Sequence, residues 1–151
     1  MKAAIVYTTL GGNTEDLAYL IAHEMNKQGV EVDLFNGIGR FGVDFRSYDI
    51  VLFGSYTWGD GELPLQMRKY LRQALIENKE KRPLVAAVFG TGDTQYKFYC
   101  RAVDEMRYHL QKNNVIVLGE PLKLEQSCRG SQLRKMQKWT NSIIGAFKYE
   151  N

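Results

Sequence analysis

The sequence predicts a single α/β domain over residues 1–151, with three layers and a doubly wound parallel sheet of five strands in the order 2-1-3-4-5. Apolar runs of strand length alternate with amphipathic helical patterns along most of the chain. The runs are apolar at nearly every position, as in strands that helices cover on both faces. The length of 151 residues suits one domain with a sheet of this size.

The elements can be placed in order along the chain. We expect strands at Ala3–Tyr7, Val30–Phe35, Ile50–Phe53, Leu84–Phe89 and Val115–Leu118. Apolar stripes at helical spacing follow four of these runs, within residues 17–25, 67–75, 103–110 and 133–147. The segment Asn36–Tyr48 lacks such a stripe, so we predict an irregular crossover with at most a short helix there.

Composition excludes several classes of protein. No apolar run approaches the ~18 residues of a membrane span, and no secretory signal is recognisable after Met1, so we expect a cytoplasmic protein without membrane contact. Cys100 and Cys128 are read as reduced thiols, and His23 and His109 have no second ligand nearby, so no metal site is expected.

The net charge of +3 is unevenly distributed. Residues 1–64 carry 4 basic and 9 acidic side chains, whereas residues 65–82 carry 6 and 2. The basic side chains fall on predicted solvent faces of helices and lack interleaved stacking aromatics, so we expect no nucleic-acid partner. The asymmetry could still steer a charged protein partner.

The turn after the first strand has the composition of a phosphate-binding loop. Residues 8–14 read Thr-Thr-Leu-Gly-Gly-Asn-Thr and join an apolar strand to an amphipathic helix. Free backbone N–H groups at the positive end of a helix dipole bind anions. The loop lacks the lysine of nucleoside-triphosphate loops and the spacing of dinucleotide loops, which favours one terminal phosphate that undergoes no chemistry.

The loops after the third and fourth strands add aromatic side chains at the same edge of the sheet. Trp58 lies beside two glycines and two carboxylates, and Tyr96 follows the glycine-rich Gly90–Asp93. Both rings can act as platforms for a planar heterocycle. A phosphate seat flanked by two such platforms fits flavin mononucleotide (FMN) better than a nucleoside monophosphate.

These motifs resemble those of the flavodoxin family over the whole chain. The resemblance rests on Ile5–Thr14 in the first loop, Thr57-Trp58-Gly59-Asp60 in the second and Phe89–Asp93 with Tyr96 in the third. The length is similar to that of the short-chain branch.

The resemblance implies roles for individual residues. Thr9, Asn13 and Thr14 would bind the phosphate together with backbone amides, Trp58 and Tyr96 would sandwich the isoalloxazine, and Asp93 would face its pyrimidine edge. The full set of implied FMN-binding residues is Thr9, Leu10, Gly11, Gly12, Asn13, Thr14, Thr57, Trp58, Gly59, Asp60, Gly61, Thr91, Gly92, Asp93, Tyr96, Phe98 and Cys100.

The resemblance also implies a function. It describes a monomeric, FMN-dependent carrier of single electrons, without a substrate of its own, between a reductase-type donor and acceptor enzymes. The Gly59 carbonyl would stabilise the neutral semiquinone after a peptide rotation that glycine permits. The carboxylates of Asp60, Glu62 and Asp93 would oppose the second electron by like-charge repulsion. No catalytic residue is implied.

Two other functions stay open from the sequence. One is a flavodoxin-fold quinone or nitro-group reductase, and the other is a signalling or docking module of the same fold without a flavin. The chain also departs from the family pattern, with Leu10 and Gly11 at positions where hydroxyl residues are common and Phe98 where tyrosine is common. Lys97 and Arg101 stand where acidic or small residues are common, which suggests a partner with a less basic docking face.

Overall fold

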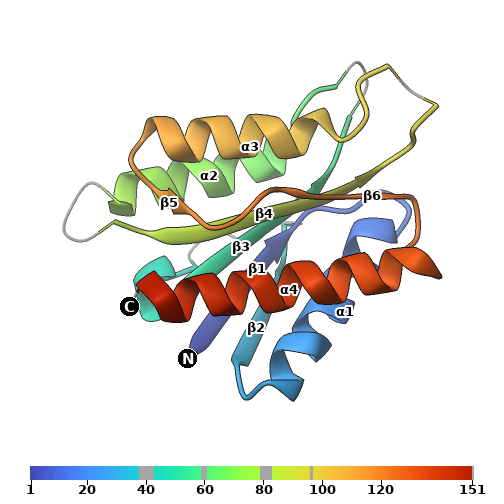
Figure 1. Ribbon diagram of the computed structural model, residues 1–151. Coiled ribbons are helices and arrows are strands. Elements are labelled where there is room, and N and C mark those ends of the chain that lie inside the picture. Colours follow the sequence, from blue (N-terminus) through green and yellow to red (C-terminus); the bar gives the residue numbers. More distant parts are fainter. Residues whose placement is uncertain (38–42, 59–60, 79–82, 96, 151) are drawn as a thin grey trace.

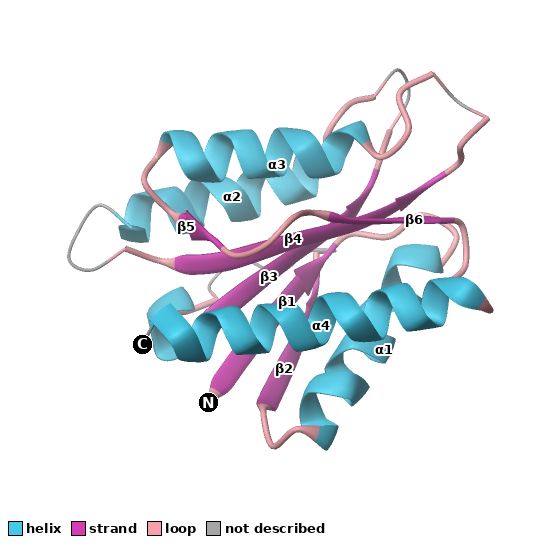
Figure 2. Ribbon diagram, viewed as in Figure 1, coloured by secondary structure: helices cyan, strands magenta, loops and turns pink. Residues whose placement is uncertain are grey.

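A computed structural model describes residues 1–37, 43–58, 61–78, 83–95 and 97–150. Figure 2 shows a central sheet with helices on both sides. The strands are β1 (Lys2–Tyr7), β2 (Glu31–Asn36), β3 (Ile50–Tyr56), β4 (Val85–Gly92), β5 (Ile116–Val117) and β6 (Leu122–Glu125). The helices are α1 (Asn13–Lys27), α2 (Leu65–Asn78), α3 (Arg101–Lys112) and α4 (Ser131–Glu150), with a short 3-10 helix at Phe45–Ser47.

The sheet confirms the predicted topology. Its strands pair in parallel in the order β2-β1-β3-β4-β5, and β6 also pairs in parallel with β4. In Figure 1, α1 and α4 cover one face of the sheet, and α2 and α3 cover the other. Each face has its own apolar core: Leu17 and Ile143 belong to the first, and Met67 and Val103 belong to the second.

The fifth strand differs from the prediction because it consists of two segments. Its predicted range, Val115–Leu118, contains only β5, and β6 continues the pairing with β4 from Leu122 onward. Gly119 has a φ of +65° and the following Pro121 has no N–H group, so the chain leaves the sheet between the segments. The indole N–H of Trp139 donates to the Glu120 carbonyl at 2.7 Å. This carbonyl lies between the two strand segments, and the indole takes the place of a donor from a neighbouring strand.

The two central strands are longer at their carboxyl ends than predicted. β3 continues past Phe53 through Gly54, and β4 continues past Phe89 through Gly90. A Cβ atom at Gly54 would lie 2.1 Å from the Phe89 ring, and one at Gly90 would lie 2.5 Å from the Ser55 carbonyl oxygen. These glycines therefore meet a packing requirement inside the sheet and do not end the strands.

Outside the undescribed residues 38–42, the crossover from β2 to β3 contains one short helix, which agrees with the prediction. The Asp44 carboxylate accepts a hydrogen bond from the Arg46 N–H at 3.2 Å and caps the 3-10 helix, which buries Phe45 completely. Within the part of the chain that the structure describes, no helix has the length and apolar character needed to cross a membrane.

The parallel strands bring the loops that follow β1, β3 and β4 to one edge of the sheet. There the Thr8 and Ser55 hydroxyl oxygens lie 3.0 Å apart in a buried contact, and the Ser55 hydroxyl also donates to the Tyr56 carbonyl. The Thr8 N–H donates to the Gly54 carbonyl at 3.0 Å. These bonds fix the first loop against the second.

Candidate functional site

The first loop forms a seat for an anion at the N-terminus of α1. Gly11 and Gly12 have φ values of +81° and +96°, which turn successive backbone N–H groups toward one side. Gly12 is the N-cap of α1 and has no side chain that could accept a hydrogen bond from the first turn. The backbone N–H groups of residues 10–14 make no hydrogen bond to any residue that the structure describes. They remain available to a phosphate.

The three predicted phosphate-binding side chains occupy different positions around this seat. Asn13 lines the pocket that the three loops form beside this seat, which is described below. The Thr9 hydroxyl accepts a hydrogen bond from the Glu15 N–H at 3.4 Å. Thr14 is buried, and its hydroxyl oxygen lies 2.8 Å from that of Thr91 at the end of β4. The Thr14–Thr91 bond joins the first loop to the third.

A partly buried contact of the Glu15 carboxylate supports the first turn of α1. The Tyr7 hydroxyl donates to Glu15 Oε2 at 2.8 Å, and the Asn36 amide donates to the same oxygen at 3.4 Å. Burial, and then the hydrogen bond to Glu15, raises the pKa of Tyr7 far above its usual value. Tyr7 therefore stays a donor, and the contact joins β1, α1 and β2 beneath the loop.

The second loop closes on itself and presents an exposed indole. The Trp58 N–H donates to the Glu62 carbonyl at 2.8 Å, and the Glu62 N–H donates back to the Trp58 carbonyl at 2.7 Å. The Trp58 side chain is 52% exposed and packs edge-on against Tyr56, with ring centroids 6.4 Å apart. Gly59 and Asp60, the predicted redox-tuning residues, lie outside the described residues.

Contacts at the start of α3 join the second loop to the third. The Ala102 N–H donates to the Thr57 hydroxyl at 3.1 Å. Gly61 has a φ of +102°, and a Cβ atom there would lie 2.8 Å from both Phe98 Cβ and Arg101 Cδ. The second loop therefore requires glycine at this position both for its backbone conformation and for its close packing.

The third loop contributes a carboxylate, an aromatic ring and a thiol. Asp93 accepts hydrogen bonds from the Gln95 N–H at 2.9 Å and from the Gln126 side-chain amide at 3.3 Å. The Phe98 side chain is half-buried. The Cys100 thiol is fully buried, and this burial raises its pKa to about 11. Tyr96 lies outside the described residues.

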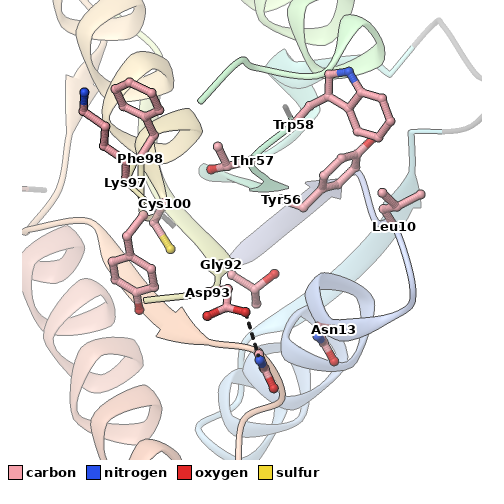
Figure 3. A pocket seen from close by; sticks show the side chains of 13 residues that line it. Leu10, Asn13, Tyr56, Thr57, Trp58, Gly92, Asp93, Lys97, Phe98 and Cys100 are labelled. Carbon is pink, nitrogen blue, oxygen red and sulfur yellow. Dashed lines mark hydrogen bonds between the residues drawn. The ribbon is translucent and has the colours of Figure 1, made fainter. Parts of the chain in front are cut away.

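The three loops enclose a pocket of about 630 Å³ (Figure 3). Trp58 and Tyr56 lie on one side of it and Phe98 on the other, with Gly92 and Asp93 between them. The predicted residues that line it are Leu10, Asn13, Thr57, Trp58, Thr91, Gly92, Asp93, Phe98 and Cys100. The predicted residues Thr9, Gly11, Gly12, Thr14 and Gly61 do not line this pocket and instead form the loops around it.

Four lining residues were not predicted to lie in the cofactor site: Tyr56, Lys97, Tyr99 and Gln126, of which Lys97 was named only for the docking of a partner. Gln126 follows β6, whose carboxyl end reaches the same edge of the sheet. Because the fifth strand was predicted to end at Leu118, Gln126 was not expected to lie near the site. Tyr99 is in the same aromatic segment as Tyr96 and Phe98, which was the available signal.

The residues present fit a flavin with a terminal phosphate. The pocket has the volume of a small-molecule site, aromatic side chains on opposite walls, and polar side chains such as Asn13, Asp93 and Gln126 that could fix the orientation of a ligand. The anion seat adjoins it through Leu10 and Asn13, and the seat offers neutral donors without a lysine. Within the described ranges, no group of three or more potential metal ligands occurs.

Comparison with known proteins agrees with this description. A family model described as Flavodoxin matches residues 5–139. A probable flavodoxin 1 of Bacillus subtilis (strain 168) is 35% identical over 124 residues, which are 82% of this chain and 77% of that protein. A flavodoxin of Maridesulfovibrio salexigens is 36% identical over 125 residues, covering 82% and 86%. The structure of oxidised Flavodoxin 2 from Bacillus cereus superposes with a TM-score of 0.84 at 31% identity, covering 96% of this chain and 99% of that one.

Proposed function

This chain belongs to the flavodoxin family, and from that premise we propose that it shuttles single electrons from a reductase to acceptor enzymes by means of a stabilised neutral semiquinone. FMN is the cofactor of the family, so the chain is an FMN-binding electron carrier. The observation that supports the finer proposal is the single pocket that three loops form beside a lysine-free anion seat.

We propose the following placement of FMN. The backbone N–H groups of residues 10–14, with Thr9, Asn13 and Thr14, bind the phosphate. Trp58 and Tyr96 cover the two faces of the isoalloxazine, and Asp93 lies at its pyrimidine edge. The bound flavin would supply the one-electron chemistry.

The protein residues would then set the reduction potentials. We propose that the Gly59 carbonyl would accept a hydrogen bond from the flavin ring N–H group that is present only after one-electron reduction. Asp60 would lie near the same ring. The reciprocal bonds between Trp58 and Glu62 support this role, because they hold the residues on either side of Gly59 and Asp60 in a closed turn at the pocket. The carboxylates of Glu62 and Asp93 add negative charge that disfavours a second electron.

The test is a stepwise photoreduction of the FMN-reconstituted protein, followed by its visible spectrum. A yellow protein that turns blue on partial reduction supports the carrier. Direct conversion of the oxidised to the fully reduced form would contradict semiquinone stabilisation, and steady oxidation of NADPH with quinone would instead support a reductase enzyme. A protein that takes up no FMN would refute the proposal as a whole.

A matched pair of variants tests the placement. Trp58→Ala should weaken FMN binding by about tenfold, because it removes stacking and buried area worth on the order of 1–2 kcal/mol. Tyr149→Ala, which removes an aromatic side chain that is 91% exposed, should leave the dissociation constant unchanged. Equal affinities in the two variants would argue against Trp58 as a platform.

A further inference from the structure

Two cations flank the aromatic ring on one wall of the pocket. The Lys97 ammonium lies 5.5 Å from the centroid of the Phe98 ring, and the Arg101 guanidinium lies 5.1 Å from it. Both side chains are exposed. These contacts hold two positive charges at the mouth of the pocket, where a redox partner would approach.

The positive charge continues from the pocket mouth along the surface between α2 and α3. Arg101 and Arg68 line one hollow, and Arg68 and Arg72 line the next. We call these four exposed residues, Lys97, Arg101, Arg68 and Arg72, the basic strip. None of them forms an ion pair with a carboxylate of the described residues.

Three carboxylates of the described chain lie beside the basic strip, and one of them already has a cationic partner. Asp104 pairs with Lys123 at 2.7 Å, whereas Glu105 lies 3.7 Å from His109, which carries a positive charge only when it is protonated. Glu62 is exposed in the hollow that contains Arg68 and Arg101 and partly offsets their charge. Among the described residues, the four cations of the strip still outnumber Glu62 and Glu105, so positive charge is left for a group outside the chain.

The hollow between α2 and α3 also has an apolar floor. Leu71 and Leu75 line it, together with Ile76, which is 58% exposed. An apolar floor with cationic edges suits a folded protein surface that combines carboxylates with apolar side chains. It suits nucleic acid less well, because bases bind mainly by stacking on aromatic rings and this floor is aliphatic.

We propose that the basic strip is the docking surface for an acidic redox protein, whose carboxylates surround its own redox centre. This inference rests on the proposed carrier function, since it names the chemistry of the partner. The cations steer the partner to the mouth of the pocket, and the apolar hollow between α2 and α3 holds part of its surface.

The test uses one haem protein in two charge states, native cytochrome c, which is basic, and the same protein with succinylated lysines, which is acidic. Binding to the immobilised FMN-loaded chain is measured by surface plasmon resonance at low and high ionic strength. The acidic form should bind faster, and its association rate should fall by about tenfold or more at high salt. Faster binding of native cytochrome c would overturn the proposal.

A double charge reversal with a matched control locates the surface. Arg68→Glu with Arg101→Glu changes two cations that do not line the pocket, and should slow association of the acidic form by about tenfold. Arg134→Glu with Lys138→Glu makes the same charge change on α4, which covers the opposite face of the sheet, and should slow it less than twofold. Equal effects would show that only net charge matters and would overturn the docking surface.

The outcomes separate this inference from the proposed function. FMN uptake is recorded first from the visible spectrum, whereas the binding readout requires no electron transfer. A chain that rejects FMN yet binds the acidic form through the basic strip would refute the carrier and retain the docking surface. Tighter binding of a single-stranded oligonucleotide than of the acidic cytochrome would assign the strip to nucleic acid and overturn the proposal.

Discussion

The buried hydrogen bond between Thr14 and Thr91 should contribute to both stability and cofactor binding. The two hydroxyl oxygens are 2.8 Å apart, and the residues are 1% and 4% exposed. Thr14→Val preserves the shape of the side chain and leaves the Thr91 hydroxyl without this partner. An unsatisfied buried hydroxyl costs about 1–3 kcal/mol, so we expect the free energy of unfolding of the apoprotein to fall by that amount.

A double-mutant cycle isolates this bond. Thr91→Val should cost about as much as Thr14→Val, whereas the double variant should cost little more than either one, because no polar group is then left unpaired. Urea unfolding of the four apoproteins, followed by circular dichroism, measures the coupling. Additive losses, with a coupling energy below about 0.5 kcal/mol, would refute the reasoning.

The same variants separate structure from phosphate binding. If the Thr14 hydroxyl also contacts the phosphate, Thr14→Val should weaken FMN binding more than Thr91→Val, although both lose the same internal bond. Flavin fluorescence quenching measures the two dissociation constants. Equal constants would place Thr14 in the loop scaffold alone.

Three further predictions follow from single side chains. Gly90→Ala should destabilise the apoprotein by about 3 kcal/mol or more, because its Cβ atom would lie 2.5 Å from the Ser55 carbonyl oxygen. Urea unfolding measures the loss, and a loss below about 1 kcal/mol would contradict this packing. In a Cys128→Ser background, iodoacetamide labelling of native Cys100 should stay slow until the pH nears 11. The raised pKa of Cys100 stabilises the folded state fully below the usual thiol pKa, and this contribution is lost as the pH rises through about 11; rapid labelling at pH 9 would contradict the burial. Leu10→Ser should tighten FMN binding about fivefold, because it adds a hydroxyl donor beside the anion seat. The change should cost no stability, since Leu10 is 60% exposed. An unchanged dissociation constant would show that the backbone N–H groups alone satisfy the phosphate.

The order of the sheet was predictable because strands covered on both faces must be apolar throughout. This pattern identified the central strands and placed their loops at one edge of the sheet. The carboxyl ends of β3 and β4 were not predictable. Gly54 and Gly90 interrupt the apolar runs, and glycine occurs there because Phe89 packs against Gly54 while Val103 of α3 and the Ser55 carbonyl pack against Gly90.

Long-range contacts within the site were beyond local patterns. Thr14 and Thr91 are 77 positions apart, and nothing near either residue specifies the other. Gln126 was missed because the interruption at Gly119 and Pro121 made the fifth strand seem to end early. The Thr14–Thr91 contact depends on how α1 packs against the sheet, and the position of Gln126 depends on the pairing of β6 with β4. Both are properties of the assembled fold.

Phe98 connects the cofactor pocket to the basic strip. Its ring forms part of the pocket wall, and the guanidinium of Arg101 lies 5.1 Å from the ring centroid. A partner carboxylate that pairs with Arg101 would therefore lie about one aromatic side chain away from the pocket. A carrier must bind its partner briefly and close to its cofactor. Long-range attraction by exposed cations raises the association rate and changes the dissociation rate little. Cations held against a wall of the pocket meet both requirements, whereas the same charges on α4 would attract the partner to the wrong face.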